Sequence, residues 1–191
     1  MSAAPATTPP APIPRARRER RWLPLLGVLA VIAAIEGGAT LAGAPTSQAM
    51  GPIQVVGGAV RIRPPSGWTA VEPHGAAREL ELTRGTVTLD VIAVPGPIGL
   101  DDLATRYLAE VLHPRVDDLA IGQPDAATLA SGVPSLRFGY VGVTDGVLIE
   151  GVATFAVGAT TGAVFDAYAP KGDLAWAAAD LGSTIRGAEV G

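Results

Sequence analysis

Residues 22–44 form a nearly continuous apolar stretch, WLPLLGVLAVIAAIEGGATLAGA, and this stretch most constrains how the chain is arranged. A helix that is apolar on every side must be buried in protein or in lipid. The stretch supplies the roughly 20 residues that a helix needs to cross the hydrocarbon core of a bilayer. Five arginines precede it, and positively charged flanks stay on the cytoplasmic side. The sequence therefore predicts a single-pass signal anchor in the cell membrane, with a cytoplasmic N-terminus and an extracytoplasmic C-terminal domain.

Two features of this stretch leave alternatives open. Glu36 is either a polar intramembrane site that pairs with a partner or a residue near the outer interface, and we favour the interface because a buried carboxylate is costly. Ser47-Gln48-Ala49 has the small-x-small pattern that precedes a signal-peptidase cut, and a cut after Ala49 would secrete the domain. Because the region before the apolar stretch is long for a signal peptide, we favour an uncleaved anchor.

The charge of the chain divides at the same stretch. Residues 1–21 carry five arginines and one glutamate, a net charge of +4, whereas residues 45–191 carry nine basic and sixteen acidic groups, a net charge of −7. The acidic domain excludes a nucleic-acid partner, because binding requires lysine and arginine to neutralise phosphates. We predict a disordered basic cytoplasmic tail (1–21), the anchor (22–44), a linker (45–52) and one α+β domain (53–188).

Composition also limits the chemistry. The chain contains no cysteine, which excludes a thiol nucleophile, a zinc–thiolate site and a lipidated cysteine. Its two histidines, His74 and His113, lie in different predicted loops, so we predict no metal and no cofactor. The serines lack the Gly-x-Ser-x-Gly context of a hydrolase, and we expect no catalytic residue and no enzyme activity. Abundant alanine, glycine, valine and proline, with Lys171 as the single lysine, indicates a GC-rich, actinobacterial genome.

Periodicity predicts an antiparallel sheet with helices. Apolar residues at spacings of three and four predict a helix from Leu100 to Leu112, which ends at His113-Pro114 because the residue before proline avoids the helical conformation. A second helix is predicted over Asp173 to Arg186. Turn residues separate three long runs and predict a meander. The predicted strands cover 59–63, 78–83, 86–94, 134–144, 147–157 and 162–169, with shorter candidates at 119–121 and 127–130.

Three carboxylates inside these predicted strands are the candidate binding residues: Asp90, Glu150 and Asp166. If their strands are neighbours, the three side chains line the mouth of one pocket. The strand alternation leaves open whether they share a face. The same carboxylates define the alternative function, an enzyme with an acidic-residue site in a sheet-edge cleft.

The domain opens with RIRPPSGW and continues with a hairpin, a helix (LDDLATRYLAEVL), a three-strand meander and a closing helix (GDLAWAAADLGSTI). In this order of elements, and in its P-x-G-W turn at residues 65–68, the chain resembles the PsbP-like α/β/α sandwich family. It is especially similar to the secreted actinobacterial branch of LpqN- and LpqT-type lipoproteins and to proteins encoded near type VII secretion systems. The chain departs from that branch in having a helix anchor and no lipobox cysteine.

The resemblance implies a fold and a class of function. The fold is a mainly antiparallel sheet flanked by helices. The family consists of accessory and binding proteins and shares no catalytic residues. We therefore expect a membrane-tethered binding or assembly module of the cell envelope, linked to secretion or lipid handling, whose partner is an envelope protein or a lipid.

Overall fold

The computed structural model describes residues 50–71 and 78–191. The predicted tail, the anchor with Glu36, the proposed cleavage site and His74 lie outside the described residues. Within those two ranges, no helix combines the length and the apolar character needed to span a bilayer.

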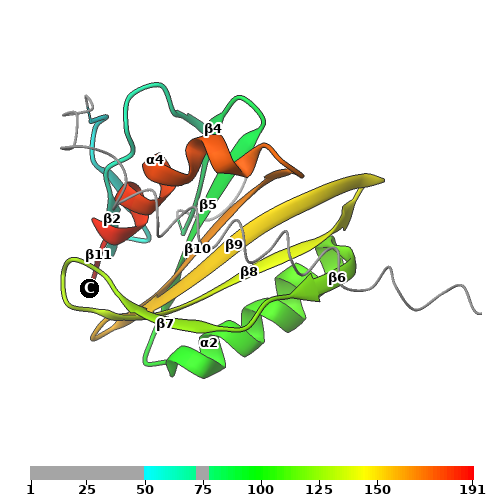
Figure 1. Ribbon diagram of the computed structural model, residues 1–191. Helices are drawn as coiled ribbons and strands as arrows, with labels where there is room; N and C mark the ends of the chain where they lie inside the picture. The colour runs from blue at the N-terminus through cyan, green and yellow to red at the C-terminus, as the bar shows by residue number, and fades with distance from the viewer. Residues whose placement is uncertain (1–49, 72–77) are drawn as a thin grey trace, which may run out of the picture.

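An antiparallel sheet of eight strands forms the middle layer of the domain (Figure 1). Its order is β3-β4-β5-β10-β9-β8-β6, and β7 also pairs with β8. The predicted hairpin (β4 and β5) and the predicted meander (β8 to β10) are both confirmed. The strands are β3 (Thr69–Val71), β4 (Glu79–Arg84), β5 (Val87–Pro95), β6 (Asp117–Ile121), β7 (Asp125–Thr128), β8 (Pro134–Thr144), β9 (Val147–Val157) and β10 (Thr161–Pro170).

Helices cover both faces of this sheet, as Figure 1 shows. On one face lie the consecutive segments α2 (Leu100–Tyr107), η1 (Leu108–Leu112) and α3 (His113–Arg115); on the other lies α4 (Leu174–Arg186). The core therefore has two parts. Leu103, Phe138 and Phe155 are buried in the part beside α2, whereas Leu89, Phe165 and Leu181 are buried in the part beside α4. The helices and the sheet together make the predicted α+β domain.

The first helical segment continues beyond its predicted end at Leu112. Residues 108–112 form a π turn, in which the His113 N–H donates to the Leu108 carbonyl. A proline ring inside an α-helix clashes with the carbonyl four residues earlier, and the wider π turn accommodates the ring of Pro114. The helical conformation therefore reaches Arg115, whose side chain lies in the site described below.

A second, three-stranded sheet has the order β1-β2-β11. It consists of β1 (Gln54–Val56), β2 (Val60–Ile62) and β11 (Glu189–Val190). Val56, Val60 and Ile62 belong to the core on the α4 side of the main sheet. Of these strands only β2 was predicted, because residues 59–63 alternate with a period of two, whereas β1 and β11 lie in no such alternating run.

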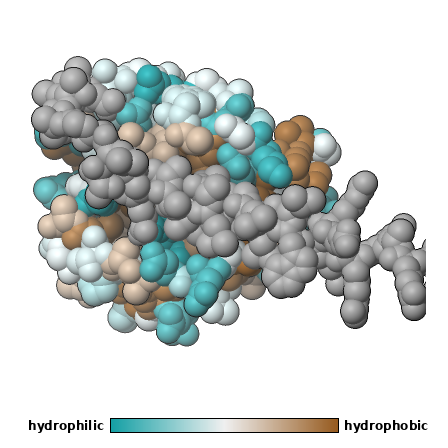
Figure 2. Space-filling model, viewed as in Figure 1, coloured by the Kyte–Doolittle hydropathy of each residue, from teal (hydrophilic) through white to brown (hydrophobic). Residues whose placement is uncertain are grey.

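Most large apolar side chains in the described residues are buried, but Val71, Trp176 and two groups of others are exposed. Met50, Ile53 and Val55 form one group at the small sheet, and Val147 with Leu148 forms the other at the β8–β9 turn. Figure 2 shows apolar surface in brown at the end of the molecule that carries this turn. Figure 1 shows β2 and the β8–β9 turn at opposite ends of the domain, so the two groups are far apart.

Candidate functional site

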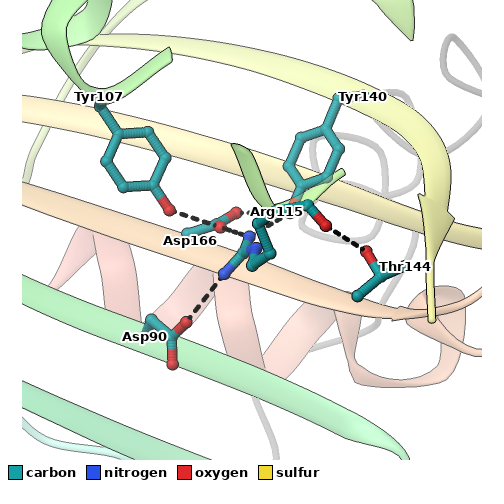
Figure 3. A network of polar contacts seen from close by, with 6 residues as sticks. All are labelled: Asp90, Tyr107, Arg115, Tyr140, Thr144 and Asp166. Carbon is teal, nitrogen blue, oxygen red and sulfur yellow. Dashed lines mark hydrogen bonds and ion pairs between the residues drawn. The ribbon is translucent and has the colours of Figure 1, made fainter. Parts of the chain in front are cut away.

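Arg115 lies at the centre of a polar network on the α2 face of the main sheet (Figure 3). Its Nη2 donates to the Asp166 carboxylate and, at 3.2 Å, to the Tyr140 hydroxyl. Its Nη1 lies 3.3 Å from Oδ2 of Asp90. The guanidinium carbon lies 4.5 Å from the ring centroid of Tyr168, in a cation–π contact. These contacts attach the end of the helical segment to β5, β8 and β10.

Asp166 is a fully buried carboxylate, with an exposed fraction of 0%. The Tyr107 hydroxyl donates to its Oδ2 at 2.7 Å, and the Tyr140 hydroxyl donates to its Oδ1 at 2.9 Å. Burial and the negative charge of Asp166 raise the pKa of both tyrosines, so both hydroxyls stay protonated and remain donors. With the Arg115 guanidinium, these donors compensate the cost of burying the charge. Asp166 therefore joins helix and sheet rather than presenting a reactive group.

Asp90 differs from Asp166 because it faces a cavity. The two aspartates are register partners in β5 and β10. Burial and the neighbouring Asp166 carboxylate raise the pKa of Asp90 to about 7, although Arg115 acts in the opposite direction. Beside Asp90 lies a cavity of about 250 Å³, which Glu79, Glu81 and Tyr107 also line. The Asp90 side chain can therefore gain or release a proton near neutral pH, and it does so at the lining of this cavity.

Glu150 lies on the opposite face of the sheet. Its register partner in β10 is Ala169, three residues from Asp166, so strand alternation directs the two carboxylates to opposite faces. The Glu150 carboxylate instead accepts hydrogen bonds from the N–H groups of Gly172 at 3.0 Å and Leu174 at 3.3 Å. A negative charge is favourable at this N-terminal end of α4. The hypothesis that all three carboxylates lie together is therefore wrong for Glu150, which is on the other face of the sheet. Asp90 and Asp166 do lie together, on either side of Arg115.

Sequence reasoning missed the partners of these carboxylates. Tyr107 and Tyr140 occupy apolar positions of a helix and a strand, and their residue pattern by itself indicates only a place in the core. Arg115 lies beyond the predicted end of its helix. One signal was present in the sequence: a tyrosine hydroxyl at a buried position needs a hydrogen-bond partner, and a carboxylate inside a neighbouring strand can provide it.

A second cavity lies on the other face of the sheet, and we call it the α4 pocket. It has a volume of about 230 Å³ between α4 and the strands β7 to β10. Its floor carries the small side chains of Ser135, Thr154 and Ala167, which leave space beneath the helix. Its lining residues are Ala127, Thr128, Leu129, Ser135, Arg137, Val152, Thr154, Ala167, Leu181, Gly182, Ile185 and Arg186.

Two arginines are the cations of the α4 pocket. Arg137 is paired with Asp125 at 2.8 Å, and its side chain is 11% exposed. Arg186 is exposed at the last residue of α4, and no ion pair joins it to a residue in the described part of the chain. The segment after β7 is attached to this end of the helix, because the Ala130 N–H donates to the Arg186 carbonyl at 2.7 Å. The pocket is thus apolar inside, with positive charge at its lining.

No metal-binding constellation is found in residues 50–71 and 78–191: nowhere do three or more histidine, aspartate or glutamate side chains converge on one point suited to an ion. The prediction of no metal and no cofactor stays a prediction.

Comparison with known proteins places the fold. No protein-family model matches the sequence, and no curated protein is similar to it in sequence. Among solved structures, CyanoP, the cyanobacterial PsbP of Synechocystis sp. PCC 6803, has a TM-score of 0.57 at 12% identity and covers 80% of this chain and 99% of its own. The Ran-binding protein Mog1p of Saccharomyces cerevisiae has a TM-score of 0.55 at 11% identity and covers 75% of this chain and 96% of its own.

LpqN of Mycobacterium tuberculosis, described as involved in cell envelope biogenesis, is also similar. Its TM-score is 0.52 at 16% identity, and the match covers 73% of this chain and 92% of LpqN. At such low sequence identities, the structural similarity shows a shared fold alone. The chain therefore has the PsbP-like α+β fold that its order of elements predicts.

Proposed function

We propose that the chain is a membrane-tethered extracytoplasmic binding module of the bacterial cell envelope, and that the α4 pocket is its ligand site. The observation that carries this proposal is the pocket itself, a hollow of about 230 Å³ with an apolar lining. Ligand sites are concave and mostly apolar, with a few polar groups that orient the ligand. Ser135 and Thr154 supply such groups here. The fold similarity to LpqN, an envelope-biogenesis protein, supports the cellular setting.

The lining favours one class of ligand. Binding against apolar walls is favoured by a free energy of about 25 cal/mol for each Å² of apolar surface that is removed from water. The exposed guanidinium of Arg186 provides a charge for an anionic group at the pocket lining. An acyl chain with an anionic end, as in an envelope lipid, meets both conditions. Lipid handling is therefore the form of binding that we propose for this module.

Photo-crosslinking tests the proposed site. A diazirine-bearing dodecanoate is added to membranes that contain the full chain, and adducts are mapped by mass spectrometry. We expect adducts on the peptides that line the α4 pocket. The substitution Ala167→Leu fills the pocket floor, and we expect it to lower these adducts about tenfold, equivalent to ~1.4 kcal/mol of binding free energy.

The matched control is Ala179→Leu, which adds the same atoms at an exposed position of α4. This control should leave the adducts unchanged. Adducts that are distributed over the whole domain, or that survive Ala167→Leu undiminished, would refute the pocket as the ligand site.

One observation favours a second candidate function, an enzyme that uses acidic residues. Asp90 has a pKa of about 7 and lines a cavity with Glu79 and Glu81, and a general acid or base works best when its pKa is near the operating pH. The two functions separate in a deletion strain. Restoration of the envelope lipid profile by Asp90→Asn but not by Ala167→Leu supports binding, and the reverse pattern supports catalysis.

A further inference from the structure

The small sheet has one buried face and one exposed face. Val55 pairs with Arg61 in register, and Glu189 pairs with the same arginine, so these three side chains share the exposed face. Ile53 and Arg63 lie one residue beyond the ends of β1 and β2, and we assign them to this face because both are exposed and line one hollow with Arg61 and Glu189. We call these five residues, together with Met50, the outer face. The opposite side of the sheet is buried in the core.

The apolar part of the outer face is unusually exposed for the domain. Ile53 is 52% exposed, Val55 is 56% exposed and Met50 is 46% exposed. Met50 and Ile53 line the same hollow of about 380 Å³ as Arg61 and Arg63. Apolar side chains and cations therefore line one concave area together.

The charge of this face is opposite to that of the domain. Its two arginines and one glutamate give it a net positive charge, whereas residues 45–191 carry a net charge of −7. Arg61 is 3.8 Å from Glu189, but both side chains are more than 60% exposed, and such an exposed pair is weak. Arg63 is exposed and has no ion-pair partner among the residues that the structure covers. The arginines are therefore available to an anionic surface.

The position of the outer face in the chain limits how far it lies from the bilayer. Met50 follows the predicted anchor by only the residues 45–49. A fully extended chain of that length spans at most about 18 Å. The anchor thus holds the outer face near the headgroups, and a tether of this kind raises the effective concentration of a weakly binding surface.

We propose that the outer face docks onto the surface of an anionic lipid bilayer, with Ile53 and Val55 in the interface and Arg61 and Arg63 on lipid phosphates. Apolar side chains combined with basic ones are typical of surfaces that lie on membranes. The proposal rests on the tether in the proposed function. It also relates the membrane to the α4 pocket, because Thr184 and Gly187 beside the outer face belong to the same end of α4 as Arg186.

Site-specific fluorescence in the full chain tests the docking. Because the chain has no cysteine, Val55→Cys introduces a single labelling site on the outer face. Val147→Cys is the matched control, since Val147 is 49% exposed and lies at the β8–β9 turn. Each variant carries an environment-sensitive dye and is reconstituted in vesicles that contain either phosphatidylglycerol or only phosphatidylcholine, with a quencher attached to the lipid.

In phosphatidylglycerol vesicles we expect lipid quenching at position 55 to exceed quenching at position 147 by at least about twofold. The difference should shrink in phosphatidylcholine. Arg63→Gln should reduce it and the exposed Arg106→Gln should leave it unchanged, because Arg63 belongs to the outer face and Arg106 does not. Equal quenching at both positions would overturn the docking. So would a shielded dye at position 55 without vesicles, which would reveal cover by the chain itself or by a second copy. Loss of the chain from the vesicle fraction would instead overturn the tether and the docking with it.

Discussion

Asp90 and Asp166 face each other as register partners across β5 and β10, and Arg115 donates to both carboxylates. Their surroundings nevertheless differ. Asp166 also accepts hydrogen bonds from two buried tyrosines, Tyr107 and Tyr140, whereas Asp90 lines a cavity beside Glu81. Asp166 is therefore enclosed by hydrogen-bond donors, whereas Asp90 is the carboxylate whose pKa is raised to about 7.

The pKa of Asp90 predicts how stability depends on pH. The folded-state pKa of about 7 lies above the ordinary value of 3.8, so the folded state holds a proton that the unfolded state has released between these values. The stability from this group is complete below about pH 4 and is lost as the pH rises to about 7. Asp90→Asn should remove this dependence and stabilise the full chain at pH 8 by on the order of 2 kcal/mol, as measured by urea unfolding in mild detergent.

The control for this measurement is Asp101→Asn, an exposed carboxylate in the first turn of α2. The control should keep the wild-type loss of stability between pH 4 and pH 7. Parallel stability curves for Asp90→Asn and wild type over this range would show that the pKa of Asp90 is not raised in the folded state.

Arg115 should be the most sensitive residue of the network. Arg115→Met removes the cation from the fully buried Asp166, and breaking one partner of a buried pair costs about 3–5 kcal/mol. The matched change Arg106→Met breaks only the exposed pair with Glu110 at 2.9 Å and should cost less than about 0.5 kcal/mol. Unfolding curves of the two variants give the comparison, and similar losses would show that the network is not a structural connection.

Glu150 has a structural role in this account. Glu150→Ala leaves the N–H groups of Gly172 and Leu174 without their acceptor and should destabilise the domain by about 1–2 kcal/mol. Under conditions in which Glu150→Ala is folded, the yield of ligand adducts in the α4 pocket should equal that of wild type. A variant as stable as wild type would contradict the assignment of Glu150 to the start of α4.

We expect the domain to be separable from the membrane, because the predicted anchor lies outside it. The full chain should stay in membranes washed with alkaline carbonate, whereas a chain that starts at residue 51 should be a folded, water-soluble domain. Fractionation with immunoblotting and circular dichroism measure the two properties. An insoluble or unfolded 51–191 fragment would contradict the proposal that residues 22–44 act only as a tether, and a soluble natural product starting near Met50 would support cleavage.

The sequence predicted the parts of the fold that depend on local periodicity. Val87, Leu89 and Val91 alternate with polar residues, and all three are buried in the core beside α4. The turn at Asp145-Gly146 has positive φ at both residues, 50° and 77°, as its residue types indicate. The helix of residues 100–112 was predicted for the same reason, since its apolar residues repeat every three or four positions.

Features that depend on contacts across the fold were not predictable from one sequence. The helix continues through Pro114 because of a π turn, and no residue pattern in the sequence predicts that turn. The face of Glu150 depends on the register between β9 and β10, and a shift of one residue would reverse it. The α4 pocket arises from small side chains on three strands and a helix, which the sequence places far apart. The carboxylates were found because their residue type is unusual inside a strand, whereas Arg115 was missed.

The most direct test of the binding function is the amount of lipid that co-purifies with the full chain from its own membranes, measured by mass spectrometry per mole of protein. We predict that wild type and Ala179→Leu retain similar amounts of one acyl-chain lipid, and that Ala167→Leu retains about tenfold less because the pocket floor is filled. Equal amounts of the same lipid on all three proteins would show that the α4 pocket does not bind an envelope ligand.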